Sequence, residues 1–413
     1  MLKVRPFKAL RPTPEVAAEL SSLPYDVMNV AEAAQMAEGK PNSFLHIIRS
    51  EIDLPSSVDV HSKPVYEKAR DNLRDFIDRG ILKQDEKAHF YIYSQTMNAR
   101  TQTGICALTS VDDYKEDKIK RHEFTLPEKE TDRINNFRAC NAHTEPVFFI
   151  NKKNDKLSTL IKDYITKNDA VYDFVSEDGI AHKFWVICDS MNEEIEGIFA
   201  DMDALYIADG HHRTNSSCRV GDILKGKGLH CEELDYIMAV IFSEDELFVM
   251  DYNRLLKDIS DLSKEDFLKK LEEDFEVTLK DELYKADEKH SFSMYIDGEW
   301  YCLKAKVGSF DEEDPVARLD AAILQDNVFE KIFGIVDPRT SDRLNFVGGI
   351  RGYEELKKRV DNKEARVAFG VYSVTIEDLL KVADAEMIMP PKSTWFEPKL
   401  RSGLFIHQFF DEI

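Results

Sequence analysis

The chain has 413 residues, of which 43% are hydrophobic and 32% charged, and its net charge at pH 7 is −23. These fractions are those of an ordinary globular protein, so they exclude a disordered or fibrous chain. The acidic balance disfavours nucleic acid as a partner, because an acidic surface repels a polyanion unless basic residues gather on one face.

The length predicts at least two domains, because a single core rarely grows beyond about 250–300 residues. We place a boundary near residue 255, between an α+β domain over 1–255 and a second α+β region over 256–413. The C-terminal segment of the second region is expected to return to the candidate functional site of the first domain. No apolar run approaches the roughly 18–20 residues that span a bilayer, and the first residues lack the apolar core of a signal peptide. We expect a cytoplasmic protein with no membrane partner, and no pattern indicates its oligomeric state.

In the first part of the chain, residues 43–49 form a short apolar run that we expect to be a buried strand. Apolar residues at helical spacing then predict a helix that ends at Gly80. Residues 89–95 and 102–111 alternate like paired strands, which predicts a hairpin. Together these elements indicate an α+β pattern.

Residues 115–145 differ from their surroundings, because they are dense in charge and poor in apolar periodicity. Such a stretch inside a compact protein is either a solvated excursion or one wall of a polar site. Strands and helices alternate after it as far as residue 226. Residues 236–242 and 247–252 are then expected to form a hairpin.

Beyond residue 255, capping patterns predict helices that begin after Ser263, Asp314 and Thr375. Asp297 and Gly298 lie between two apolar runs and are the strongest hairpin signal in the chain. The predicted fold class is therefore α+β, with mixed and antiparallel sheets and flanking helices.

The most informative stretch is residues 204–219, ALYIADGHHRTNSSCR. An apolar run ends at Asp209 and Gly210 and passes into a good helix start, so we interpret it as strand, tight turn and helix. A helix amino end exposes unpaired N–H groups, and glycine lets a ligand approach the backbone closely. An anion is the natural ligand of such a junction.

The side chains of this turn suit the same ligand. Arg213 can bind a phosphate or carboxylate through two charge-assisted hydrogen bonds, and His211 and His212 titrate near neutral pH. The alternative is an ordinary turn in which Asp209 caps the helix and the histidines pack locally. A metal site is disfavoured, because adjacent histidines in a turn rarely point at one ion and the six cysteines include no C-x-x-C pair.

The charged stretch supplies a second set of candidates, the cations Lys120 and Arg121 and the carboxylates Glu123 and Glu130. A phosphoryl-transfer site needs cations for the phosphates and a carboxylate that binds Mg²⁺ or accepts a hydroxyl proton. The alternative is a solvated surface with casual ion pairs.

A third candidate lies near the C-terminus, where prolines flank Lys392, Ser393 and Thr394. These residues offer a cation and two hydroxyl groups, whereas the alternative is a proline-rich surface tail. A glycine cluster at residues 348–352 lacks the spacing of a phosphate loop and is a weaker candidate.

Short motifs throughout the chain resemble those of one prokaryotic family, the domain of unknown function 1015. They are residues 7–12 (FKALRP), 24–27 (PYDV), 43–46 (SFLH), 119–123 (IKRHE), 129–130 (KE), 132–133 (DR), 208–213 (ADGHHR) and 390–400. The resemblance covers nearly the whole chain and implies no activity by itself.

Residues 209–213 also resemble the phosphate-binding box of the ParB and sulfiredoxin superfamily, whose free-serine kinases carry a very similar Asp-Gly-His-His-Arg sequence. The resemblance implies a ParB/sulfiredoxin-like core in which Gly210 through Arg213 bind phosphate. This chain is much longer than those kinases, and none of its residues aligns with their N-terminal catalytic glutamate.

The leading hypothesis is a kinase-type phosphotransferase that acts on a small hydroxylated metabolite such as free serine, with ADP, ATP or CTP and Mg²⁺ as cofactors. The alternatives are a ParB-like nucleotide-binding module with a DNA-related or partition role, and a metal-dependent phosphatase or nuclease. The catalytic candidates are Glu123, Glu130 and His212. The phosphate-binding candidates are Asp209, Gly210, His211, His212, Arg213, Lys120, Arg121, Lys392, Ser393 and Thr394.

Overall fold

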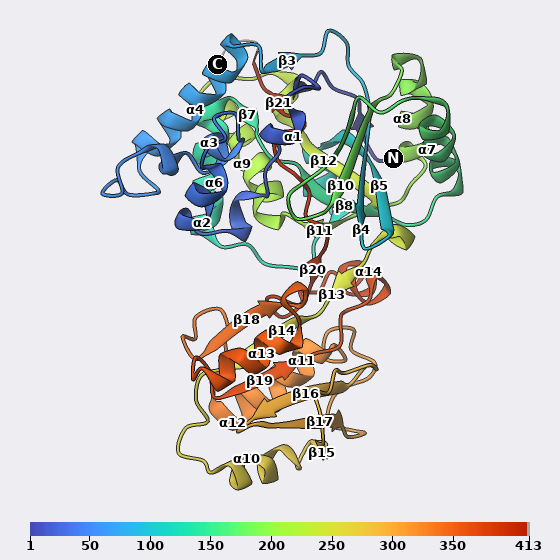
Figure 1. The fold of residues 1–413 in the computed structure, drawn as a ribbon. Helices are drawn as coiled ribbons and strands as arrows, with labels where there is room; N and C mark the ends of the chain where they lie inside the picture. Colours follow the sequence, from blue (N-terminus) through green and yellow to red (C-terminus); the bar gives the residue numbers. More distant parts are fainter. Residues whose placement is uncertain (411–413) are drawn as a thin grey trace. The chain divides into compact units, whose positions relative to one another are not determined.

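The computed structural model describes residues 1–410, and the chain divides into two compact units. The first unit contains Met1–Lys120, Thr125–Leu247 and Pro398–Ile413, and the second contains Arg121–Phe124 and Phe248–Glu397. The units are not continuous in sequence, whereas the predicted domains 1–255 and 256–413 are; that division stays a prediction. Both units combine helices with mixed or antiparallel sheets, so the predicted α+β class is confirmed (Figure 1).

The large sheet of the first unit has the strand order β6-β11-β8-β12-β5-β4-β10-β9, and β1 pairs with β5 beside this path. Strands β6 and β11 are parallel, as are β8 and β12, and the other neighbours are antiparallel. The strands of this unit, small ribbons included, are β1 Val4–Arg5, β2 Leu10–Pro12, β3 Leu82–Gln84, β4 Tyr91–Met97, β5 Arg100–Ser110, β6 Ile119–Lys120, β7 Ala142–His143, β8 Val147–Asn151, β9 Tyr172–Val175, β10 Ala181–Val186, β11 Leu205–Asp209, β12 Tyr236–Ser243 and β21 His407–Gln408.

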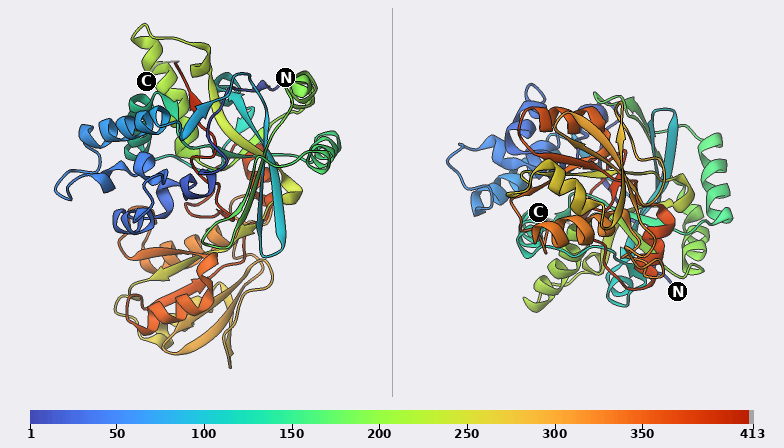
Figure 2. Two further views of the ribbon diagram at one scale, coloured as in Figure 1. Left: turned by 45° about the horizontal axis from the view of Figure 1, so that its top comes forward. Right: turned by 90° about the horizontal axis from the view of Figure 1, so that it is seen from below.

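Helices cover both sides of this sheet. The green helices α7 and α8 lie on one side and the blue helices α2 to α4 on the other, in both Figure 1 and the left view of Figure 2. Helix α7 begins after its cap Asn154 and packs Leu157, Leu160 and Ile161 into the same apolar cluster as the central strands. The helices of this unit are α1 Ala17–Leu20, α2 Val30–Ala37, α3 Leu45–Ile48, α4 Lys63–Asp78, α5 Val111–Lys115, α6 Pro127–Cys140, α7 Asp155–Lys167, α8 Asn192–Ala200 and α9 His211–Gly226.

The second unit has an antiparallel sheet with the strand order β15-β17-β16-β19-β14-β18. Asp297 and Gly298 form the turn between β16 and β17, as the sequence predicts. The elements of this unit are β13 Val249–Met250, β14 Tyr252–Leu256, α10 Lys264–Leu271, β15 Phe275–Lys280, β16 Ser291–Ile296, β17 Glu299–Ala305, α11 Asp320–Leu324, a π-helix Gln325–Glu330, α12 Lys331–Phe333, β18 Leu344–Gly348, α13 Gly352–Asp361, β19 Val367–Gly370, α14 Ile376–Asp384 and β20 Trp395–Phe396.

Two sequence-based predictions of secondary structure are wrong, and a third is displaced, because the helix expected to begin after Asp314 begins only at Asp320. Residues 43–49, expected as a strand, contain helix α3. Phe44, Leu45, Ile47 and Ile48 all lie in one apolar cluster, whereas a strand would point neighbouring side chains to opposite faces. Residues 236–242 and 247–252 do not pair as a hairpin. Strand β12 joins β5 and β8 in the first unit, and β14 joins β18 and β19 in the second.

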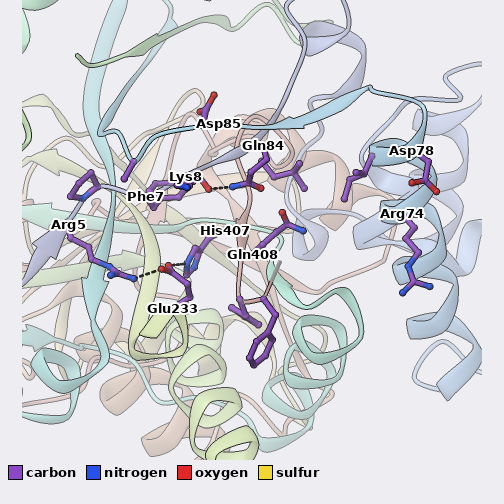
Figure 3. A pocket seen from close by; sticks show the side chains of 16 residues that line it. Arg5, Phe7, Lys8, Arg74, Asp78, Gln84, Asp85, Glu233, His407 and Gln408 are labelled. Carbon is purple, nitrogen blue, oxygen red and sulfur yellow. Dashed lines mark hydrogen bonds and ion pairs between the residues drawn. The ribbon is translucent and has the colours of Figure 1, made fainter. Parts of the chain in front are cut away.

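The C-terminal segment of the first unit is fixed by buried polar contacts as well as by β21, which pairs with β7. His407 Nε2 lies 2.6 Å from Glu233 Oε2, and Arg5 Nη2 lies 2.9 Å from the other Glu233 oxygen (Figure 3). His407 Nδ1 lies 3.1 Å from His143 Nδ1 on the neighbouring strand. Arg5, Glu233 and His407 line a cavity of about 750 Å³.

No helix within residues 1–410 combines the length and the apolar character needed to cross a lipid bilayer.

Candidate functional site

The turn predicted to bind an anion lies in the first unit, between β11 and α9. Gly210 precedes the helix with φ 95° and ψ 29°, and no side chain caps the helix there. This left-handed conformation favours glycine. The predicted order of strand, tight turn and helix is confirmed.

The Arg213 side chain hydrogen-bonds to other groups of the protein at this turn. Its side chain is buried, its Nη2 donates to Asp209 Oδ2 at 2.9 Å, and its Nη1 donates to the Pro146 carbonyl at 2.5 Å. Burial alone would lower the pKa of Arg213, but the charges of Asp209, Asp26 and Glu145 outweigh burial and raise it. These hydrogen bonds hold the turn, and the predicted contact of Arg213 with a phosphate stays a prediction.

Gly210→Ala is expected to lower the free energy of unfolding of the first unit by about 1–3 kcal/mol, because alanine is strained in this conformation. The added Cβ would also lie 3.2 Å from Arg213 Nη2 and from Val147 Cγ1. Hydrogen exchange of the β8 and β11 amides measures the loss. Gly179→Ala is the control for backbone strain alone, since that glycine also has a positive φ but a Cβ added there would meet no atom within 4 Å.

Helices α6 and α9 lie side by side and run in the same direction. The Leu126 N–H donates to His212 Nε2 at 3.0 Å at their amino ends. One turn further along, Asn215 Nδ2 donates to Glu130 Oε1 at 2.6 Å, and later still Ile134 and Val220 share an apolar cluster. Both amino ends therefore face the same way, and neither has a side-chain cap. Two positive helix-dipole ends add at this place.

A lysine from the C-terminal segment approaches the same turn. Lys399 Nζ lies 3.7 Å from Asp209 Oδ1. The segment is held on the sheet by Gln95, whose Nε2 donates to the Lys399 carbonyl at 2.8 Å, and by Gln102, which hydrogen-bonds to Gln95 at 3.0 Å. The sequence analysis named Lys392 as the cation of this stretch and did not name Lys399.

A buried carboxylate, Glu145, connects several segments behind the turn. It accepts hydrogen bonds from the Tyr25 N–H, from Ser402 Oγ and from Arg133 Nη1, each at 3.1 Å. The Arg133 guanidinium in turn lies 3.8 Å from the centre of the Tyr25 ring. Motifs 24–27 and 132–133 thus meet in one buried polar network. The next residue after Glu145 is Pro146, whose carbonyl accepts from Arg213 of motif 209–213. No local pattern indicates Glu145 itself.

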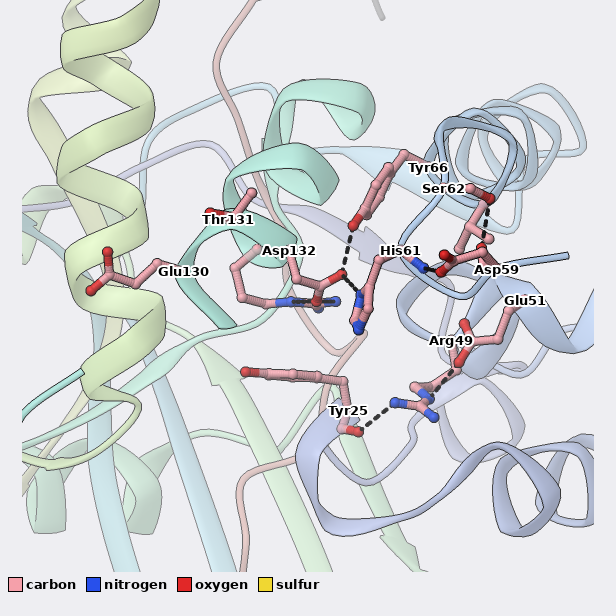
Figure 4. A network of polar contacts seen from close by, with 12 residues as sticks. Tyr25, Arg49, Glu51, Asp59, His61, Ser62, Tyr66, Glu130, Thr131 and Asp132 are labelled. Atoms are coloured by element: carbon pink, nitrogen blue, oxygen red, sulfur yellow. Dashed lines mark hydrogen bonds and ion pairs between the residues drawn. The ribbon is translucent and has the colours of Figure 1, made fainter. Parts of the chain in front are cut away.

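Next to this network lies a cavity of about 680 Å³. Its wall combines aromatic rings, both signs of charge and the first turn of α6; Tyr25, Asp26, Arg49, His61, Tyr66, Pro127, Lys129 and Asp132 are among the lining residues. Figure 4 shows His61 and Tyr66 pointing toward Asp132, with the Tyr25 ring below them. Pro127 and Lys129 belong to the first turn of α6, so the cavity adjoins the amino end of that helix, and Leu126, which precedes Pro127, hydrogen-bonds to His212 of α9.

The remaining predicted residues of the first unit are His211, Lys120 and Glu130. His211 is buried in the first turn of α9, and the Lys120 ammonium lies 5.9 Å from the centre of the Tyr206 ring. Glu130 is buried between α6 and α9, where Thr125, Asn215 and Arg219 hydrogen-bond to it. Burial would raise the pKa of Glu130, but these hydrogen bonds lower it, so this carboxylate is a weak base and serves helix packing.

The other predicted residues belong to the second unit. Lys392 lies 5.7 Å from the centre of the Tyr252 ring, Ser393 Oγ donates to the Pro390 carbonyl at 2.6 Å, and Thr394 Oγ1 lies 3.5 Å from His122 Nε2. Arg121 is exposed and Glu123 half-buried. A composite site that also includes Arg213 stays a prediction.

Among residues 1–410, no group of three or more His, Cys, Asp or Glu side chains is placed to hold a metal ion.

The model of the family described as "Protein of unknown function (DUF1015)" matches residues 4–322. A comparison with curated proteins gives no match. Among solved structures, the chain is similar to a conserved hypothetical protein from Pyrococcus furiosus at 13% identity and a TM-score of 0.37, covering 74% of this chain and 97% of that one.

Two other solved structures show a likeness of the same size. A free serine kinase in complex with AMP is 14% identical over 70% of this chain and 89% of its own, with a TM-score of 0.37. SbnI from Staphylococcus aureus, with a C-terminal truncation, is 12% identical over 73% and 87%, with a TM-score of 0.36. Likenesses of this size assign no activity to the chain.

Proposed function

The chain belongs to the DUF1015 family of proteins of unknown function, and we propose that its first unit is a nucleotide-dependent phosphotransferase that acts on a small hydroxylated metabolite. Free serine is the specific acceptor we propose to test. The resemblance of residues 209–213 to the phosphate box of the ParB and sulfiredoxin superfamily agrees with this proposal.

The observation that carries the proposal is the pair of uncapped, parallel amino ends of α6 and α9 beside Lys399. Backbone N–H groups at a helix start point outward without intrahelical partners, and the helix dipole favours negative charge there. A nearby ammonium group adds a charge-assisted contact. An anion of the size of a nucleotide phosphate tail matches these donors better than a neutral ligand does.

We assign the roles within this proposed site as follows. The turn at Gly210, the first turn of α6 and Lys399 bind the phosphates, while Arg213 and Glu145 hold the backbone behind them. His212 accepts a hydrogen bond from the Leu126 N–H and fixes the two helix starts against each other. The adjoining cavity, lined by Tyr25 and Asp26, takes the acceptor metabolite.

Lys399→Ala is expected to weaken binding of MgATP and MgADP about 10-fold or more, since a hydrogen bond to a charged group contributes about 1.5–3 kcal/mol. The measurement is isothermal titration calorimetry at low ionic strength, with the rise in melting temperature as a second readout. Lys392→Ala is the matched control, because this lysine lies in the same C-terminal stretch but belongs to the second unit.

The two variants separate the hypotheses. Loss with Lys399→Ala alone supports a site confined to the first unit, and equal losses support the composite site that includes Lys392. Absence of any binding of nucleotide or inorganic phosphate by the wild type at millimolar concentration would remove the proposal. Release of inorganic phosphate without transfer would favour a phosphatase, and DNA retention that falls with salt would favour a ParB-like module.

A further inference from the structure

We infer that His61 and Asp132 form a catalytic dyad in which His61 accepts the proton of the metabolite's hydroxyl group. This inference rests on the proposed phosphotransfer and assigns its general base. The sequence singled out neither residue for catalysis, and the carboxylates it preferred, Glu123 and Glu130, lie in the second unit and between two helices, respectively.

Asp132 is held as a fixed, ionised acceptor. Its Oδ2 accepts hydrogen bonds from Arg133 Nε at 2.9 Å and from Arg133 Nη2 at 2.5 Å. Its Oδ1 accepts a hydrogen bond from the Tyr66 hydroxyl at 2.8 Å. Burial would raise the pKa of Asp132, but the charge and hydrogen bonds of Arg133 and the hydroxyl of Tyr66 lower it. The carboxylate therefore stays charged at neutral pH, and these hydrogen bonds fix its orientation.

His61 Nδ1 lies 3.2 Å from the same Oδ1 (Figure 4). An ionised carboxylate only accepts hydrogen bonds, so it selects the tautomer in which Nδ1 carries the hydrogen and Nε2 carries the lone pair. The backbone is fixed as well, because the His61 N–H donates to Asp59 Oδ1 at 2.8 Å and Ser62 Oγ donates to the Asp59 carbonyl at 2.6 Å. Ring and tautomer are thus set from both sides.

The position of the ring also suits a base. The His61 side chain is 69% exposed and lines the 680 Å³ cavity, whose wall includes Lys129 in the first turn of α6. An exposed histidine paired with a carboxylate is commonly a weak surface ion pair. Here, however, the Asp132 side chain is only 13% exposed and has three further donors on it, which is the arrangement of an oriented imidazole rather than of a casual pair.

The step balances without any added reagent beyond the nucleotide and the metabolite. The hydroxyl oxygen forms a bond to the terminal phosphorus while its proton moves to His61 Nε2. The bond from that phosphorus to the bridging oxygen breaks, and the shortened nucleotide leaves with the electron pair. Asp132 stabilises the resulting imidazolium, which then releases its proton to water.

His61→Gln tests the assignment, with His230→Gln as the control, since His230 is another exposed histidine of the first unit. Phosphate transfer from MgATP and MgADP to L-serine, and in parallel to glycerol, is measured together with nucleotide affinity. His61→Gln should lower kcat about 100-fold or more, while nucleotide affinity stays within twofold of wild type.

Asp132→Asn tests the positioning role. An amide can donate to Nδ1 and favour the other tautomer, so kcat should fall while KM changes little; its melting temperature shows whether the fold survives the loss of the Arg133 partner. His61→Gln with wild-type kcat would overturn the dyad and leave the phosphotransferase standing. Nucleotide binding by the wild type without transfer to either acceptor would overturn the dyad and leave only the phosphate site.

Discussion

Arg213→Ala is expected to lower the free energy of unfolding of the first unit by about 3–5 kcal/mol, the usual cost of removing one partner of a buried ion pair. The substitution leaves the half-buried Asp209 carboxylate and the Pro146 carbonyl without the guanidinium that satisfies them. Amide hydrogen exchange of β8, β11 and α9 measures the loss locally, which is preferable to a single melting temperature for a chain of two units.

Arg79→Ala is the matched control, because Arg79 pairs with Asp75 on the exposed face of α4 and such pairs contribute about 0–1 kcal/mol. A variant at Arg213 that keeps wild-type exchange rates but no longer binds nucleotide would contradict the structural role. It would restore the role indicated by the sequence, in which Arg213 contacts phosphate directly.

The contrast between these two roles shows how far a local pattern reaches. Residues 204–219 predict strand, glycine turn and helix correctly, because the apolar run, the glycine and the helix start are neighbours in sequence. The partner of the arginine was not predictable, since Pro146 lies 67 residues away and reaches Arg213 only through the pairing of β8 with β11.

Helix α6 is an element that the sequence pattern did not predict. The sequence indicated that residues 115–145 line a polar site or a solvated excursion, but not that they contain a helix of fourteen residues. The buried face of α6 includes Glu130, Arg133 and Asn136, so its hydrophobic periodicity is broken by polar side chains that take part in hydrogen bonds inside the unit. Hydrophobic spacing detects helices that bury apolar faces, and this one buries a network.

Contacts between residues far apart in sequence also decide which candidate residues lie at the site. The sequence places Lys392 and Lys399 in one proline-rich stretch, and nothing local distinguishes them. In the structure Pro398 begins the segment that belongs to the first unit, so a short separation along the chain decides which lysine reaches Asp209. His61 was missed because its partner, Asp132, lies 71 residues away.

Acid is expected to destabilise the first unit well before its carboxylates titrate. From pH 7.5 to 5.5 buried neutral histidines should lower its free energy of unfolding by about 3–4 kcal/mol, about 1.4 kcal/mol each, and His46, whose pKa is raised by its hydrogen bond to Asp53, opposes part of this fall. Burial and the nearby His407 hold the pKa of His143 well below its ordinary value, and burial and Arg401 lower the pKa of His182 to about 3. Burial also lowers the pKa of His407, although Glu233 opposes this.

The direction of this stability change depends on how many protons the folded and unfolded states bind. Above pH 7 these histidines are largely neutral in both states, so they add little pH dependence. As the pH falls through about 6.5, the unfolded chain binds protons that the folded unit excludes, and stability is lost. Urea unfolding at both pH values, followed by hydrogen exchange of β4 and β5, measures the difference.

His182→Phe removes one of the titrating groups and should reduce the pH-dependent loss by about 1.4 kcal/mol, whatever it does to stability at pH 7.5. His230→Gln is the matched substitution at a histidine whose side chain is exposed in the folded unit. An equal loss in the wild type and His182→Phe would mean that the folded unit admits protons to this interior. The Tyr93 hydroxyl oxygen, 2.8 Å from His182 Nδ1, would then accept a hydrogen bond from an imidazolium.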